Sequence, residues 1–195
     1  MDCIKAGKLI LSLRKEKNMT QKEIADALNI SDKTISKWER GLGCPDISLI
    51  NELSNILGVN VEKLLIGDLS PNSKDTGNLK HIKFYVCSNC GDIIYSTGRP
   101  DISCCGRKLV PLVYKEHDKE HKITIDEIEN DYYITINHEM TKNHYISFVA
   151  YVSFDQVLLV KLYPEQNAEI RIPKRKKGKI YVYCSKHGLW RKENK

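Results

Sequence analysis

The chain has 195 residues, of which 41% are hydrophobic and 29% charged, a composition typical of globular proteins. No apolar run approaches the ~20 residues that span a membrane, and the first eleven residues lack the plan of a signal peptide. We therefore expect a cytoplasmic protein with room for two or three small modules and with mostly reduced cysteines. The net charge of +6 resides in the C-terminal part, because residues 1–68 hold ten basic and ten acidic side chains. Charge thus neither favours nor excludes nucleic acid as a partner.

Residues 1–68 show the apolar periodicity of helices, interrupted by capping residues. Thr20 with Glu23 forms a capping box, Ser31 is a further N-cap, and Gly41 is a helix stop. The first predicted helix runs from the N-terminus to near Asn18, with an apolar face of Ile4, Leu9, Leu11 and Leu13. Four more are predicted over about 21–28, from Ser31 to about Arg40, from Asp46 onward, and over Val61 to Ile66.

This segment resembles the phage-repressor/Cro-type helix-turn-helix family. The residues that carry the resemblance are Thr20-Gln21, Ala25, Ile30-Ser31, Thr34-Ile35-Ser36, Trp38-Glu39 and Gly41. The resemblance implies that the helix after Ser31 enters the major groove of double-stranded DNA. It places Asp32, Lys33 and Lys37 against base edges, and Gln21, Thr34 and Arg40 on phosphates, with Ile35 and Trp38 pointing inward. The alternative is a protein-interaction module whose charges are only solvated.

Polar residues from Gly67 to Gly77 predict a flexible linker. We divide the chain into a helix-turn-helix domain at 1–68, a linker at 69–81, a cysteine module at 82–116 and a histidine module at 117–195. Cys3 and Cys44 have no evident partner and are expected to be small buried or incidental residues.

Two cysteine pairs follow the linker, Cys87-x-x-Cys90 and Cys104-Cys105. Four thiolates in a tetrahedron suit iron or zinc. Strands are expected at 82–86 and 93–95. The adjacent pair followed by glycine resembles desulforedoxin, a small rubredoxin-like iron domain, which implies iron; zinc remains the alternative metal.

From residue 122 onward the sequence alternates like β-strands. Strands are expected around Ile123 and Ile125, over 132–136, 145–152 and 157–163, and finally over 180–183, as a small antiparallel sandwich. His138, His144 and His187 then lie at strand ends or loops, where metal ligands can converge.

Two motifs, His138 to Ile146 and Tyr183 to Trp190, resemble the neelaredoxin/superoxide reductase domain. Together with the cysteine module the match is to desulfoferrodoxin, which implies an all-β body with an immunoglobulin-like sandwich. The resemblance implies a ferrous iron with His121, His138, His144 and His187 in a plane and Cys184 on the axis. It implies one-electron reduction of superoxide to hydrogen peroxide.

The first ligand departs from the family pattern. The family has Glu-Lys before its histidine, whereas this chain has Lys119-Glu120 before His121. The resemblance makes Lys119 and Glu120 candidate catalytic residues, and their transposition predicts slow or altered turnover. His121 is the expected ligand, with His117 as the alternative.

The sequence as a whole indicates an iron-binding, redox-responsive transcription regulator whose body senses or reduces superoxide. The alternatives are an active superoxide reductase with an appended helix-turn-helix, and a metal-binding interaction protein without turnover. Expected partners are double-stranded DNA, superoxide and an electron-donor protein such as a rubredoxin, with no membrane. Both modules resemble dimer-formers, so we expect a homodimer.

Overall fold

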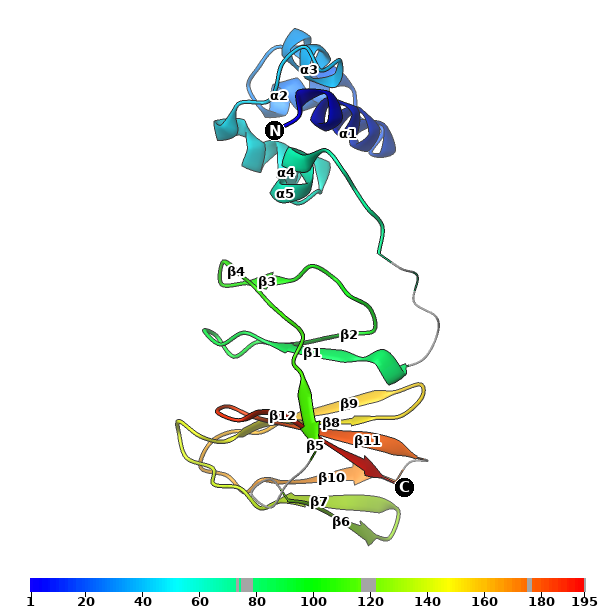
Figure 1. Cartoon of the computed structure of the whole chain (residues 1–195), viewed down its shortest axis with the longest axis vertical. Helices are drawn as coiled ribbons and strands as arrows, with labels where there is room; N and C mark the ends of the chain where they lie inside the picture. Colours follow the sequence, from blue (N-terminus) through cyan, green and yellow to red (C-terminus); the bar gives the residue numbers. More distant parts are fainter. Residues whose placement is uncertain (73, 75–78, 117–121, 175–176, 195) are drawn as a thin grey trace. The chain divides into compact units, whose positions relative to one another are not determined.

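The computed structural model describes residues 1–72, 74, 79–116, 122–174 and 177–194 (Figure 1). The chain forms two compact units, Met1–Pro71 and Asn72–Lys195, each with its own hydrophobic core. We call them the head and the body. Within the described residues, no helix combines the length and the apolar character needed to cross a membrane.

The head is a cluster of short helices around Ile10, Ile24, Ile35 and Leu53, all of which are fully buried. Its elements are α1 (Cys3–Glu16), α2 (Gln21–Ala27), α3 (Asp32–Glu39), the 3-10 turn η1 (Ile47–Leu49), α4 (Ile50–Leu57) and α5 (Val61–Ile66). The capping box at the start of α2 is present, because the Thr20 hydroxyl accepts from the Glu23 backbone N–H and the Glu23 carboxylate accepts from that of Thr20. The segment after Asp46 begins as a 3-10 turn rather than directly as an α-helix.

The apolar face of α1 differs from the expected one. Ile4 is 59% exposed, whereas Ile10, which was not expected in the core, is fully buried. The buried side follows the three-to-four-residue spacing of Ala6, Leu9 and Leu13, and Ile4 lies off that stripe.

The two cysteines of the head are paired. A disulfide joins Cys3 to Cys44, with 4.9 Å between their Cα atoms. The expectation that these residues have no partner was therefore wrong. Forty-one positions separate them, and only the folding of α1 against the end of α3 brings them together.

The body consists of two antiparallel strand pairs and two larger sheets. The two strand pairs form the cysteine-bearing part. The cysteine-bearing part contains η2 (Leu79–His81), β1 (Lys83–Val86), β2 (Ile93–Ser96), β3 (Ser103–Cys104) and β4 (Arg107–Lys108). Strands β1 and β2 pair antiparallel, as do β3 and β4.

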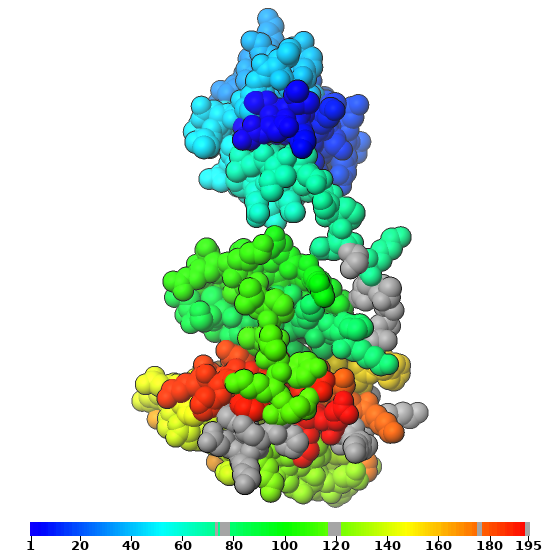
Figure 2. Space-filling model, viewed as in Figure 1, coloured from blue at the N-terminus to red at the C-terminus, as the bar shows by residue number. Residues whose placement is uncertain are grey.

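The remaining strands form a three-stranded and a five-stranded sheet. The first has the order β10-β7-β6, from Glu169–Pro173, Asp131–Ile136 and Ile123–Ile128. The second has the order β5-β12-β11-β8-β9, from Tyr114–Glu116, Gly188–Asn194, Gly178–Cys184, Ile146–Val152 and Val157–Lys161. Only the β5–β12 pairing is parallel among these described strands, and Figure 2 shows the green segment that leads into β5 lying across the red C-terminal strand.

The five-stranded sheet is covered on both faces (Figure 1). On one face, Ile146 and Val182 share a core with Ile134 and Ile170 of the three-stranded sheet. On the other face, Phe148 belongs to a second core that includes the β1 side chain Phe84, 5.5 Å away between ring centroids. This double coverage explains why β8 is buried at every position, as a central strand should be. The body is thus a β-sandwich with the cysteine-bearing hairpin packed on its outer face.

The expected strands are present, but five others were not predicted: β3, β4, β5, β10 and β12. The strand over 180–183 is therefore not the last one, because β12 follows it and pairs with it along its whole length. The immunoglobulin-like character of the sandwich stays a prediction.

Candidate functional site

Three histidines and a cysteine converge at one end of the sandwich. One ligand atom from each of His138, His144, Cys184 and His187 lies within 4.8 Å of the others. His138 follows β7, His144 precedes β8, Cys184 ends β11, and His187 stands in the β11–β12 turn. The antiparallel pairing of β8 with β11 brings the two motifs together, since Ile146 is the register partner of Cys184.

The three imidazole rings stand at steep angles to one another. The His144 centroid lies 4.5 Å from that of His138 and 4.7 Å from that of His187, with interplanar angles of 76° and 83°. Cys184 is fully buried and His187 is exposed, so the sulfur lies deep and the His187 side chain lies at the surface. Nε2 of both His138 and His144 is buried, so within the described cluster it is His187 that solvent reaches.

The polar contacts of His144 fit a metal ligand. Its Nδ1 is hydrogen-bonded to the carboxylate of Glu139, and its Nε2 is buried and makes no hydrogen bond within the described residues. A metal-binding histidine typically has one nitrogen on a carboxylate and the other on the metal. The contact with His144 also holds the pKa of Glu139 below its usual range. The Cys184 sulfur accepts the His187 backbone N–H at 3.4 Å. These donors fit a metal that takes imidazole and thiolate together.

The four cysteines of the second cluster also lie within 4.8 Å of one another. The Cys104 sulfur is 3.4 Å from that of Cys90 and 4.0 Å from that of Cys105. A tetrahedron with metal–sulfur bonds of about 2.3 Å has sulfurs about 3.8 Å apart, close to these values. The backbone N–H groups of Cys90 and Asn89 lower the pKa of Cys87 to about 6, which favours the thiolate that a metal requires.

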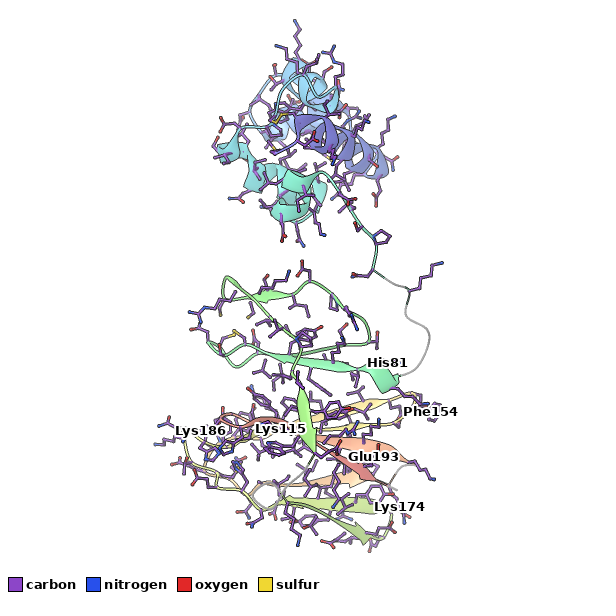
Figure 3. All side chains as sticks on the ribbon, viewed as in Figure 1. His81, Lys115, Phe154, Lys174, Lys186 and Glu193 are labelled. Carbon is purple, nitrogen blue, oxygen red and sulfur yellow. A yellow bond between two sulfur atoms is a disulfide. The ribbon has the colours of Figure 1, made fainter. Side chains whose placement is uncertain are left out.

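Two lysines lie close to the histidine cluster (Figure 3). The Lys115 ammonium, on β5, is 3.5 Å from the His187 carbonyl oxygen and 5.2 Å from the centroid of the Trp190 ring. Lys186 directly precedes His187 and contributes its charge to the field at Glu139. Sequence reasoning missed Lys115 and Glu139 as functional candidates. Glu139 had a signal, since it directly follows the ligand His138; Lys115 had none, because only the parallel β5–β12 pairing places it there.

Four residues that the sequence singled out lie outside the described residues: the ligand candidates His117 and His121, and the catalytic candidates Lys119 and Glu120. The described cluster therefore holds three of the four expected imidazoles.

The helix expected to read DNA is α3. Ser31 caps it, and Asp32, Lys33 and Lys37 are exposed, whereas Ile35 and Trp38 are buried as expected. Thr34 is half-buried and its hydroxyl lies 2.9 Å from that of Ser31.

The side chains of the remaining two DNA-contact candidates, Gln21 and Arg40, donate hydrogen bonds within the head. Gln21 donates to the Glu39 carboxylate at 2.6 Å, and Arg40 donates from Nε to the Ser36 carbonyl at 3.1 Å. Glu39 is also the acceptor of a part-buried ion pair with Arg14, at 2.5 Å. Gln21 therefore helps to satisfy a buried carboxylate, a role that the sequence did not indicate.

Comparison with known proteins assigns two regions. The helix-turn-helix family model matches residues 10–64, and the desulfoferrodoxin family model matches residues 105–193. The chain is 35% identical over 77 residues to the HTH-type transcriptional activator BcrR of Enterococcus faecalis. That alignment covers 38% of this chain and spans only 38% of the activator.

The body has its own relatives. The chain is 25% identical over 118 residues to the desulfoferrodoxin of Clostridium acetobutylicum, an alignment that covers 56% of this chain and 94% of that protein. The crystal structure of the superoxide reductase from Treponema pallidum shares the fold, with a TM-score of 0.51 and 18% identity over 57% of this chain and 97% of that one. Residues 10–64 thus form a helix-turn-helix domain and residues 105–193 a desulfoferrodoxin domain, united in one chain.

Proposed function

We propose that the protein is an iron-dependent, redox-responsive transcription regulator of the cytoplasm whose body reduces superoxide to hydrogen peroxide. The observation that carries the proposal is the convergence of three imidazoles and a buried cysteine sulfur within 4.8 Å. His138, His144 and His187, together with His121, would hold ferrous iron, with Cys184 as the sulfur ligand. Cys87, Cys90, Cys104 and Cys105 would hold a second iron, for which zinc is a substitute.

Iron at the histidine site would supply the one electron that, with two protons, converts superoxide to hydrogen peroxide. The surrounding residues prepare the site for this reaction. Glu139 orients His144, and the exposed edge at His187 gives a diffusing anion access. Lys115 and Lys186 make the approach electropositive, which favours a small anion over neutral molecules. An electron-donor protein such as a rubredoxin would restore the reduced state.

The head would bind double-stranded DNA through α3. Exposed Lys33 and Lys37 support this reading, because lysines there can donate to guanine edges or phosphates. Asp32 and Thr34 complete the surface, and Arg40 and Gln21 flank it. Recognition of a palindromic operator would require a homodimer.

Anaerobically purified full chain tests the metal proposal directly. We expect two irons per chain, and oxidation of the histidine-site iron by a pulse of superoxide with hydrogen peroxide as the product. Cys104→Ser should remove the absorption of the four-cysteine centre and preserve the superoxide reaction. His144→Ala should do the reverse. Absence of any oxidation by superoxide in a chain that holds iron at both sites would refute the reductase.

The second candidate is a superoxide reductase whose head serves as a tether. The retained set of His138, His144, Cys184 and His187 favours it, since these side chains converge whether or not the head binds DNA. Selection of binding sites from random DNA separates the two functions. Recovery of a palindrome supports the regulator, whereas salt-labile binding without sequence preference supports the tether.

A further inference from the structure

Two of the seven cysteines lie outside both metal clusters, and they are bonded to each other. The bond is visible in the head in Figure 3. Disulfides in proteins of a reducing compartment are usually transient and redox-sensing. We infer that Cys3 and Cys44 form a reversible thiol pair that hydrogen peroxide oxidises, and that the closed disulfide favours the DNA-binding form of the head. The inference rests on the proposed function, because peroxide is the product assigned to the body.

The disulfide joins α1 to the segment that leaves α3. Cys3 is the first residue of α1, and Cys44 follows α3 by a few residues. The two helices touch directly at this end. A Cβ added at Gly7 of α1 would lie 2.0 Å from the Trp38 carbonyl oxygen, and one added at Gly41 would lie 3.0 Å from the Ile4 Cα. The bond therefore fastens the exit of the presumed recognition helix to a packed helix pair.

The segment between α3 and η1 has few other attachments. Gly41 donates to the Trp38 carbonyl and Leu42 to that of Lys37, each at 2.9 Å. Among the described residues, the backbone N–H groups of Gly43 and Cys44 make no hydrogen bond, and the Leu42 side chain is 67% exposed. Opening the disulfide thus frees the two residues, Gly43 and Cys44, that lie between the hydrogen-bonded Leu42 and the buried Pro45.

This restraint bears on DNA binding through entropy. Lys37 and Arg40 lie in the last turn and at the C-cap of α3, next to the restrained segment. A surface that is ordered before binding loses less conformational freedom when it binds. The closed form should therefore bind the operator more tightly than the open form.

The chemistry balances with peroxide as the oxidant. Both cysteines are half-buried, so a small oxidant can reach them. The Cys3 thiolate attacks one peroxide oxygen; the O–O bond breaks, and with one proton taken up, water and a sulfenic acid form. The Cys44 thiolate then displaces the hydroxyl group, which leaves as water, and the S–S bond forms. Two thiols lose two electrons and two protons, and one peroxide becomes two waters. A dithiol reductant reverses the reaction.

The coupling of head to body is then chemical. It needs no rigid connection between the two units, because peroxide diffuses from its source to the cysteine pair. The same site would also respond to peroxide from other sources.

The first test follows the bond in iron-loaded full chain that has been reduced anaerobically. After peroxide addition, alkylation and mass spectrometry should recover the Cys3 and Cys44 peptides joined. Superoxide should produce the same bond, and catalase should prevent it. Free thiols at both positions after peroxide treatment would overturn the inference. Because superoxide also disproportionates to peroxide without an enzyme, the superoxide arm is repeated with His144→Ala. A bond that forms equally fast in wild type and His144→Ala would refute the body as the source of peroxide and leave the pair intact.

The second test measures operator affinity at one salt concentration. The wild type with the closed disulfide should bind the operator at least about fivefold more tightly than the reduced wild type. Cys3→Ser combined with Cys44→Ser should match the reduced wild type and show no change on peroxide treatment. Gly43→Ala, whose added Cβ has nothing within 4 Å, is the control and should keep the response. Helical circular dichroism verifies that each variant is folded. Equal affinity of closed and reduced wild type, weaker binding of the closed form, or a full response in the double variant would each overturn the inference.

Discussion

Glu139 is the residue that fixes the imidazole of His144. The Glu139 carboxylate is hydrogen-bonded to Nδ1 of His144, so that Nε2, which is buried and makes no hydrogen bond within the described residues, is left to bind a metal. Loss of such a partner typically lowers metal affinity by about 10- to 100-fold. Glu139→Gln should therefore weaken iron binding at the histidine site by that order. Competition with a chelator measures it, and Glu193→Gln, which alters an ion pair at the other end of β12, is the control. Unchanged iron retention would assign Glu139 no orienting role.

Lys115 is expected to guide superoxide toward the exposed His187 side chain. A positive charge at a small-anion site raises the encounter rate, and salt screens the effect. Lys115→Met should slow the reaction of the reduced iron with superoxide by roughly two- to tenfold at low salt. Lys174→Met, on the loop after β10 (Figure 3), should have little effect. Pulse radiolysis over a range of ionic strengths measures both. A deficit that persists at high salt would point to a structural defect at β5 instead.

The convergence of the two side-chain groups could be predicted in part from local sequence. Cys87 and Cys90 are three positions apart, a spacing that by itself indicates a metal site, whereas Cys184 and His187 were expected from the resemblance of their motif to a known family. The disulfide could not be predicted, because no local pattern connects positions 3 and 44. Lys115 belongs to the same class, since its place depends on a parallel pairing between strands about 75 positions apart.

Helix α1 fits against the end of α3 only because Gly7 lacks a side chain. A methyl group there would meet the Trp38 carbonyl oxygen at 2.0 Å. Gly7→Ala should therefore force the helices apart and destabilise the head by about 1–3 kcal/mol or more. Gly43→Ala is the control, because nothing lies within 4 Å of its added Cβ. Urea unfolding followed by helical circular dichroism reports on the head, since all α-helices of the described residues lie there.

Helix α3 offers two kinds of contact. If Lys33 reaches a base edge, Lys33→Ala should cost about 1–3 kcal/mol at the preferred operator and relax one position of the sequence preference. If Arg40 contacts a phosphate, Arg40→Ala should weaken all sites alike and reduce the salt slope by about one. Binding-site selection with each variant distinguishes the two. Identical behaviour of the two variants would contradict the assigned division of labour.

Strands β10 and β12, which the sequence analysis did not predict, show why a weak local pattern is not enough to identify a strand. β10 alternates Ile170 and Ile172 with polar residues, so its signal was present but short. β12 has the buried Leu189 and Trp190 near its start and continues with charged residues, and it becomes a strand because β11 pairs with it residue by residue, from Gly178 to Cys184. Tertiary pairing overrides weak local preference in such strands.

The whole molecule contains two units with separate cores, and each has its own stabilising element. The head carries the disulfide, and the body carries the two ligand clusters. A crosslink between positions 41 apart stabilises a fold by about 4 kcal/mol in the chain-entropy estimate. Metal binding stabilises only the unit that binds it.

Thermal unfolding of the full chain should therefore show two transitions. Cys3→Ser combined with Cys44→Ser should lower only the transition seen in helical circular dichroism, because that bond lies entirely within the head. Iron removal by a chelator should lower only the transition of the β-rich body. Differential scanning calorimetry with circular dichroism resolves the two effects. A single transition, displaced by either change, would mean that the units stabilise each other, and redox signals could then pass between them without a diffusing oxidant.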